Sequence, residues 1–210
     1  MNNKNDIIFL IDDDDSVRRS ITLLLKSEQY NVESFQSAEE FLERDAYAGT
    51  GCIILDVNLE GKSGLELQED LLKTSSHLPI IFITGKGDIP MSVQALKKGA
   101  INFLLKPFND NQLLSAVEEA LEKCSSLKEK SDEILKAKKI IEELTPREYE
   151  ILQYVLTGML NKQISSELNI SEQTVKIHRG KITEKLGIKS VAEIVRLAEI
   201  AGIKLPKSKY

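Results

Sequence analysis

The chain has 210 residues, of which 41% are hydrophobic and 29% are charged, and it carries a net charge of −5. This composition is ordinary for globular proteins and argues against a disordered or fibrous chain. No apolar run approaches the ~18 residues that a membrane helix needs, and the N-terminus has no signal-peptide pattern. Two widely spaced cysteines, Cys52 and Cys124, form neither a disulfide framework nor a metal cluster. These features predict a protein of the reducing cytoplasm with no membrane partner.

The charge is distributed unevenly along the chain. Residues 1–124 carry 12 Lys and Arg against 21 Asp and Glu, whereas residues 125–210 carry 16 against 12. An acidic half joined to a basic half indicates two domains with different partners. Acidic clusters suit cations, and basic faces suit nucleic acid.

Apolar runs alternate with amphipathic stretches through the first half. The runs are 7–11, 31–35, 52–55, 79–83 and 101–105, and the amphipathic stretches lie near 16–27, 37–45, 64–74, 89–98 and 110–123. Ser37 and Glu40 predict a capping box at the second of these stretches. Strand–helix alternation over residues 1–124 predicts an α/β domain with a doubly wound, five-stranded parallel sheet, flavodoxin-like in size. Ligands of such sheets bind outside the carboxyl ends of the strands.

The second half predicts a linker and a small all-α domain. Residues 125–142 are charged with sparse apolar positions, which indicates a helical linker and gives only a weak coiled-coil signal. A helix then begins at Thr145 as N-cap, with Glu148 completing a capping box. Further helices are expected at 161–168, 171–186 and about 190–201. Two helices about a tight turn in a basic module are typical of a helix-turn-helix domain, here over residues 143–210.

Four predicted strand ends carry polar side chains. Asp12 to Asp15 follow the first run, and Asp56, Thr84 and Lys106 end or follow the third, fourth and fifth. Because these positions share one sheet edge, they are expected to converge. Each is ordinary by itself, since an aspartate run often only caps a helix, but all four occur in order. Carboxylates with a backbone oxygen suit Mg²⁺, and a carboxylate can also act as a nucleophile that forms an aspartyl phosphate.

The helix at 171–186 has two distinct faces. Its apolar stripe comprises Val175, His178, Ile182 and Leu186, where His178 is expected to be a packed, hydrogen-bonded core residue. The opposite face contains Gln173, Lys176, Ile177, Gly180 and Lys181. On DNA, Lys176 would reach base edges and Ile177 a thymine methyl group. Gly180 costs the helix about 1 kcal/mol relative to Ala, which close approach to DNA would explain. The residues suited to phosphate contacts are Lys162, Thr174, Arg179 and Lys181.

These motifs resemble known families. Residues 7–123 resemble the receiver domain of two-component response regulators, in Ile11–Asp14, Leu55–Asn58, Ser63–Leu67, Ile83–Gly85 and Lys106–Phe108. Residues 143–201 resemble the LuxR-type helix-turn-helix, notably in Thr174–Arg179. The combination is similar to transcription factors of the NarL/FixJ class, and Gly85–Met91 looks FixJ-like.

The resemblance implies a role for each pocket residue. Asp56 would be the phosphoacceptor, with Thr84 and Lys106 as its catalytic partners and a cis bond from Lys106 to Pro107. Mg²⁺ would be held by Asp12, Asp13, Asp56 and the carbonyl of Asn58. Thr84 and Phe103 would form the switch. Glu60 departs from the family pattern, which usually has Pro at this position. Asp14 and Asp15 would be helix-start anions.

The implied function is regulation of transcription. A sensor histidine kinase would phosphorylate Asp56, the protein would dimerise through the surface around residues 89–123, and the homodimer would bind double-stranded operator DNA, more commonly to activate transcription. RNA polymerase is a candidate partner. The protein would not be an enzyme beyond its own phosphoryl transfer and dephosphorylation.

Two alternatives stay open from the sequence. Asp12, Asp14 and Ser16 loosely fit the D-x-D-x-S pattern of haloacid-dehalogenase-like phosphatases, which would leave Asp56 unexplained. The chain could also be a regulator that binds DNA without phosphorylation.

Overall fold

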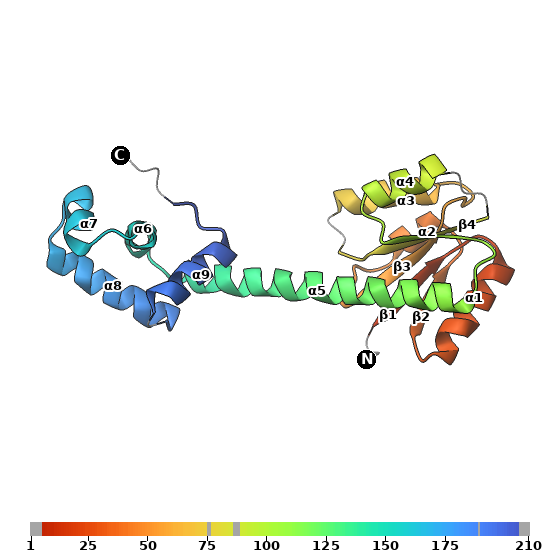
Figure 1. Ribbon diagram of the computed structural model, residues 1–210, viewed down its shortest axis with the longest axis horizontal. Helices are drawn as coiled ribbons and strands as arrows, with labels where there is room; N and C mark the ends of the chain where they lie inside the picture. Colours follow the sequence, from red (N-terminus) through yellow and green to blue (C-terminus); the bar gives the residue numbers. More distant parts are fainter. Residues whose placement is uncertain (1–5, 75–76, 86–88, 189, 206–210) are drawn as a thin grey trace. The chain divides into compact units, whose positions relative to one another are not determined.

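The computed structural model describes residues 6–74, 77–85, 89–188 and 190–205 (Figure 1). Residues 86–88 of the FixJ-like stretch lie outside them. The chain divides into two compact units, residues 1–128 and 129–210, and each is described by itself.

The first unit contains a parallel five-stranded sheet. Its strands are β1 (Ile7–Ile11), β2 (Asn31–Phe35), β3 (Gly51–Asp56), β4 (Ile80–Thr84) and β5 (Asn102–Leu105). Their spatial order is β2-β1-β3-β4-β5, and all neighbours are parallel. The register pairs Ile11 with Leu55 and Asp56 with Ile83, so the carboxyl ends lie level with one another. The predicted doubly wound sheet is confirmed.

Helices cover both faces of this sheet (Figure 1). They are α1 (Asp15–Ser27), α2 (Ala38–Glu43), α3 (Gly64–Lys73), α4 (Ile89–Lys97) and α5 (Asp110–Glu142). Strand residues alternate between two apolar clusters, because successive side chains of a strand point to opposite faces. Phe9 lies in the cluster that includes residues of α2, α3 and α4, whereas Ile8 lies in the cluster that includes residues of α1 and α5.

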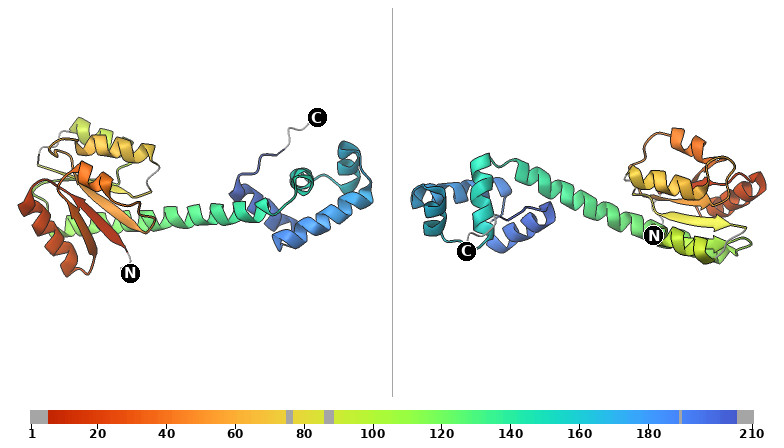
Figure 2. Two further views of the ribbon diagram at one scale, coloured as in Figure 1. Left: turned by 180° about the vertical axis from the view of Figure 1, so that it is seen from behind. Right: turned by 90° about the horizontal axis from the view of Figure 1, so that it is seen from above.

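Two sequence expectations in this unit need correction. Ser37 caps α2 by accepting from the amide of Glu40, but the Glu40 carboxylate accepts from the amide of Gln36, so only half of the expected box forms. The fifth helix does not end near residue 123. It continues through the expected linker as one helix of 33 residues (Figure 2). Residues 110–142 contain no Gly or Pro and many Lys, Glu and Leu, which favour the helix throughout.

The second unit consists of short helices around an apolar core. They are α6 (Pro146–Leu156), α7 (Asn161–Leu168), α8 (Glu172–Leu186) and α9 (Val191–Ala201). Thr145 and Glu148 form the predicted capping box of α6. Asn169 ends α7 at a φ of +51°, a left-handed conformation that makes the tight turn into α8. The predicted helix-turn-helix is therefore present. No helix among the described residues combines the length and apolar character that crossing a membrane requires.

Candidate functional site

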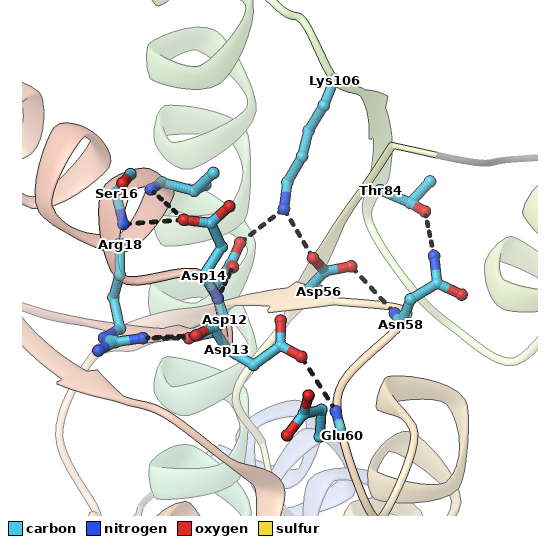
Figure 3. A network of polar contacts seen from close by, with 11 residues as sticks. Asp12, Asp13, Asp14, Ser16, Arg18, Asp56, Asn58, Glu60, Thr84 and Lys106 are labelled. Atoms are coloured by element: carbon cyan, nitrogen blue, oxygen red, sulfur yellow. Dashed lines mark hydrogen bonds and ion pairs between the residues drawn. The ribbon is translucent and has the colours of Figure 1, made fainter.

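The predicted polar residues meet at the carboxyl edge of the sheet (Figure 3). Asp12 follows β1, Asp56 and Thr84 end β3 and β4, and Lys106 follows β5. Asp12, Asp56 and Thr84 are buried, with 0%, 6% and 0% of their surface exposed. Buried carboxylates are rare without a partner, because desolvation strongly disfavours their charge. Their convergence therefore marks a specialised site.

Lys106 supplies the compensating charge. Its Nζ donates to Oδ2 of Asp12 at 2.7 Å and to Oδ2 of Asp56 at 2.6 Å. Burial raises the pKa of Asp12 above its usual range, although the hydrogen bond from Lys106 opposes that rise. Burial alone would lower the pKa of Lys106, but the hydrogen bonds to the two carboxylates outweigh it, and the net shift is upward. Lys106 is thus held as an ammonium ion beside both carboxylates.

Three carboxylates can share a cation. Asp12, Asp13 and Asp56 each offer an oxygen, and these oxygens lie within 4.8 Å of one another. Hard oxygen ligands of this kind, few in number, fit Mg²⁺, which usually binds through one or two carboxylates and keeps several waters. The donor set therefore fits the metal that the sequence predicts.

The loop after β3 contacts this pocket at several points that sequence reasoning missed. The amide of Asn58 donates to Oδ1 of Asp56 at 3.0 Å, and its side-chain Nδ2 donates to Oγ1 of Thr84 at 2.8 Å. The amide of Glu60 donates to Oδ2 of Asp13 at 3.1 Å. The family resemblance implied only the carbonyl of Asn58 as a ligand and marked Glu60 as a departure from the family pattern. A residue type shows only that a main-chain N–H is present, as it is at Glu60, so the loop geometry is needed to show what that N–H binds.

The aspartate run has a divided role. Asp14 is the N-cap of α1 and accepts from the amides of Ser16 and Val17, while Asp15 pairs with Arg18 in the first turn. Arg18 also donates to the main-chain oxygen of Asp12 at 2.7 Å. The expected helix-start role of Asp14 and Asp15 is confirmed. In the phosphatase alternative Asp14 and Ser16 would serve the reaction, but here both take part in the helix cap.

Other expected features of the pocket are also found. The peptide bond between Lys106 and Pro107 is cis. Phe103 is half-buried, and the centroid of its ring lies 6.3 Å from that of Phe82. A Cβ on Gly64 would lie 2.2 Å from the main-chain oxygen of Asp56, so only glycine lets α3 begin this close to the end of β3. Gly64 thereby permits the close approach of α3 to the Asp56 backbone.

The two faces of α8 match the predicted pattern. Val175, Ile182 and Leu186 are buried. Lys176, Gly180 and Lys181 are exposed, as is Ile177, of which 50% of the surface is open to solvent. A Cβ on Gly180 would meet no heavy atom within 4 Å, so packing within the described chain does not require glycine there. Lys162 is likewise exposed near the start of α7.

One expectation in this unit is wrong, and two other side chains make contacts that the sequence did not predict. His178 is half-buried, but its buried Nδ1 has no hydrogen-bond partner among the described residues, so the expected hydrogen-bonded histidine is wrong at this atom. Helical spacing places His178 on the same face as the buried Val175 and Ile182, and apolar side chains offer a ring nitrogen no hydrogen-bond partner. Arg179 donates to Oδ1 of Asn161 at 2.9 Å and so braces α7 against α8, and Thr174 hydrogen-bonds to Ser171.

The fold and pocket together define a class of protein. A doubly wound receiver-type sheet with this acidic edge, carried on one chain with a helix-turn-helix, is the architecture of a two-component response regulator. Residues 8–118 match the response regulator receiver domain, and residues 142–198 match the bacterial regulatory proteins of the luxR family. The chain belongs to the response regulators with a LuxR-type DNA-binding domain.

Relatives agree with this assignment over nearly the whole chain. Nodulation protein W of Bradyrhizobium diazoefficiens is 45% identical over 94% of this chain and 87% of its own length. The solved structure of the response regulator StyR is 43% identical, covers 92% of this chain and 98% of its own, and has a TM-score of 0.83. Full-length FixJ from B. japonicum is 33% identical, covers 96% and 100%, and has a TM-score of 0.59. The FixJ-like resemblance is confirmed, and the phosphatase alternative is not supported.

Proposed function

We propose that Asp56 accepts a phosphoryl group from a sensor histidine kinase and that its phosphorylation controls dimerisation and DNA binding. The observation that carries this proposal is the position of Lys106 at the carboxyl edge of the sheet. Its Nζ lies 2.6 Å from Oδ2 of Asp56 and 2.7 Å from Oδ2 of Asp12. An ammonium group so placed neutralises an incoming phosphoryl group as well as the resident carboxylates.

The chemistry is a direct transfer between two nucleophiles. A carboxylate oxygen of Asp56 attacks the phosphorus of a phosphohistidine, the new O–P bond forms as the P–N bond breaks, and the imidazole leaves with the bonding pair and takes a proton from water. Mg²⁺, held by Asp12, Asp13, Asp56 and the carbonyl of Asn58, would neutralise charge on the phosphoryl oxygens. Lys106 stays bound to Asp12 and pairs with a phosphoryl oxygen, so the transfer needs no further cation from the chain.

The switch begins at Thr84. Its hydroxyl accepts from Nδ2 of Asn58 in this structure. A phosphoryl group on Asp56 offers a stronger, charged acceptor, so the Thr84 hydroxyl would reorient to donate to it. That movement opens space beside β5, into which Phe103 would turn.

The surface that would respond lies over residues 89–123. Val93, Leu96 and Leu105 are exposed there, with 42%, 45% and 55% of their surface open to solvent. Exposed apolar side chains gathered on one surface are typical of an association site. We propose that phosphorylation joins two copies through this surface, which couples two weak DNA half-sites through effective concentration.

The second unit would read the DNA. Lys176 and Ile177 project from α8 into solvent and would contact base edges in the major groove, where Gly180 permits close approach. Lys162, Thr174 and Lys181 would contact phosphates, as would Arg179 while it keeps its bond to Asn161. Such a regulator acts in the bacterial cytoplasm, and RNA polymerase is a candidate partner there.

One experiment tests this function as a whole. DNA binding and oligomer mass are measured on the full chain with and without a small phosphodonor and Mg²⁺. Phosphorylation should convert monomer to dimer and tighten binding to operator DNA. Equal mass and equal DNA affinity in both states would contradict the proposal and favour a regulator that works without phosphorylation.

A further inference from the structure

We propose that Glu60 is a positioning residue for the Mg²⁺ site and that it acts through its main-chain amide rather than its carboxylate. This inference rests on the proposed function, which places Mg²⁺ beside Asp13. The amide nitrogen of Glu60 lies 3.1 Å from Oδ2 of Asp13 and donates to it (Figure 3). The bond joins the end of β1 to the loop after β3, across 47 residues of chain.

The residue type at position 60 decides whether this bond exists. Every amino acid except proline supplies a main-chain N–H, and proline is what the receiver pattern usually carries at this position. Glu60 therefore adds a donor that a proline at the same place would lack. A carboxylate that binds a metal is commonly oriented by a second hydrogen bond of this kind.

The loop that carries the amide is fixed on both sides of it. On one side, the amide of Asn58 is bound to Asp56. On the other, the amide of Lys62 donates to Oε1 of Glu39 on α2 at 3.2 Å. Gly61 between them has a φ of +80°, a conformation that glycine adopts without strain. The Glu60 amide is therefore aimed at Asp13 by contacts that do not involve Asp13.

The carboxylate of Glu60 has a lesser role. The side chain is exposed, and the group of carboxylates with oxygens close enough to share an ion comprises Asp12, Asp13 and Asp56 without Glu60. An exposed charge outside the ligand group acts on the ion only through a solvent-screened field. The hydrogen bond from the Glu60 amide instead orients the Asp13 carboxylate before the ion arrives. This lowers the entropy cost of ordering that carboxylate when the ion binds.

Three substitutions separate the amide from the side chain. Glu60→Gln removes the charge, Glu60→Ala removes the side chain, and Glu60→Pro removes the N–H. Magnesium chloride is titrated into each full-length variant, and the dissociation constant is taken from amide shifts in ¹⁵N NMR spectra. The Pro variant should bind Mg²⁺ roughly tenfold more weakly than the Ala variant, in line with the loss of other orienting contacts. The Gln and Ala variants should stay within about twofold of the unsubstituted chain.

A second measurement does not depend on metal or on the Pro variant folding. In metal-free protein, Asp13→Ala should move the Glu60 amide proton upfield and speed its exchange with solvent, while the Asn58 amide stays unchanged. An unmoved Glu60 amide, or equal affinities in the Pro and Ala variants, overturns the inference while the Mg²⁺ site stands. If the unsubstituted chain shows no Mg²⁺-dependent shifts at Asp12, Asp13 and Asp56, the proposed function fails, and this inference fails with it.

Discussion

The pocket at the sheet edge and the exposed face of α8 are built in opposite ways. In the pocket, Lys106 binds two carboxylates that lie 94 and 50 residues before it in the chain, and both carboxylates are buried. On α8, Lys176, Ile177 and Lys181 lie within six residues and project into solvent. The pocket depends on the whole sheet to assemble it, whereas the α8 face needs only one helix held by its apolar stripe. Substitutions should therefore have larger effects in the first region than in the second.

The largest effect is expected at Asp56. Asp56→Asn removes the nucleophilic carboxylate while keeping its size, so modification by a small acyl phosphate with Mg²⁺ should disappear entirely. Intact-mass measurement of the added phosphoryl group checks this. Asp13→Asn is the matched control, because it should strongly weaken Mg²⁺ binding and leave the acceptor in place. A label that persists in Asp56→Asn would remove Asp56 from its assigned role.

The next largest effect is expected at Thr84, where a substitution should separate phosphoryl transfer from dimerisation. Thr84→Ala deletes the hydroxyl that Asn58 holds in this structure but leaves Asp56 and Lys106 unchanged. We expect the variant to accept the phosphoryl group and to stay monomeric afterwards, because the group that senses phosphorylation is gone. Light scattering on phosphorylated samples measures this. Thr84→Ser retains the hydroxyl and should restore the dimer; normal dimers of Thr84→Ala would contradict the proposed switch.

The sequence predicted which side chains of the pocket converge but not the main-chain contacts that support them. Side-chain identity and strand order were enough to bring Asp12, Asp56, Thr84 and Lys106 to one edge, because parallel strands end together. Contacts made by main-chain amides, such as that of Glu60 to Asp13, depend on loop conformation, which the residue types alone do not give. The hydrogen-bond partners of individual side chains, such as Asn58 with Thr84, could not be predicted from the sequence either.

The second unit shows the same limit. The helix boundaries followed from caps and glycines, and the buried and exposed faces of α8 followed from helical periodicity. Arg179 was assigned to phosphate from its charge, yet it also braces Asn161 on the neighbouring helix. Helical periodicity determines on which face of its helix a side chain lies, but it does not determine which hydrogen-bond partner a neighbouring helix provides.

An intermediate effect is expected on the α8 face. Lys176→Ala and Ile177→Ala should each reduce discrimination between operator and scrambled duplex, by about 1–3 kcal/mol for a good polar contact and less for an apolar one. Lys181→Ala should weaken both duplexes equally and lower the salt slope by about one. Titrations of both duplexes at several salt concentrations distinguish these outcomes. An unchanged operator-to-scrambled ratio in the first two variants would mean that this helix does not read the sequence.

The smallest effect concerns the stability of the DNA-binding unit. Glu148 is buried beside the N-cap of α6, and Lys185 of α8 donates to its Oε2 at 2.7 Å. The hydrogen bond from Lys185, together with that from the Thr145 amide, lowers the pKa of Glu148 to about 2. Because the folded pKa lies below the ordinary value of 4.5, this contribution is complete above about pH 5 and is lost as the pH falls toward 2.

Glu148→Gln isolates that contribution. Glutamine still completes a capping box, so the variant loses only the charge interaction with Lys185. Lys185 remains about one-third exposed, so water compensates it, and we expect a loss of no more than about 1 kcal/mol at pH 7. Hydrogen exchange of α6 and α8 amides measures it without interference from the other unit. At pH 7 these amides should exchange faster in the variant, and the difference should vanish near pH 2; a difference that persists there would show that Glu148 stabilises the helix pair by packing rather than by charge.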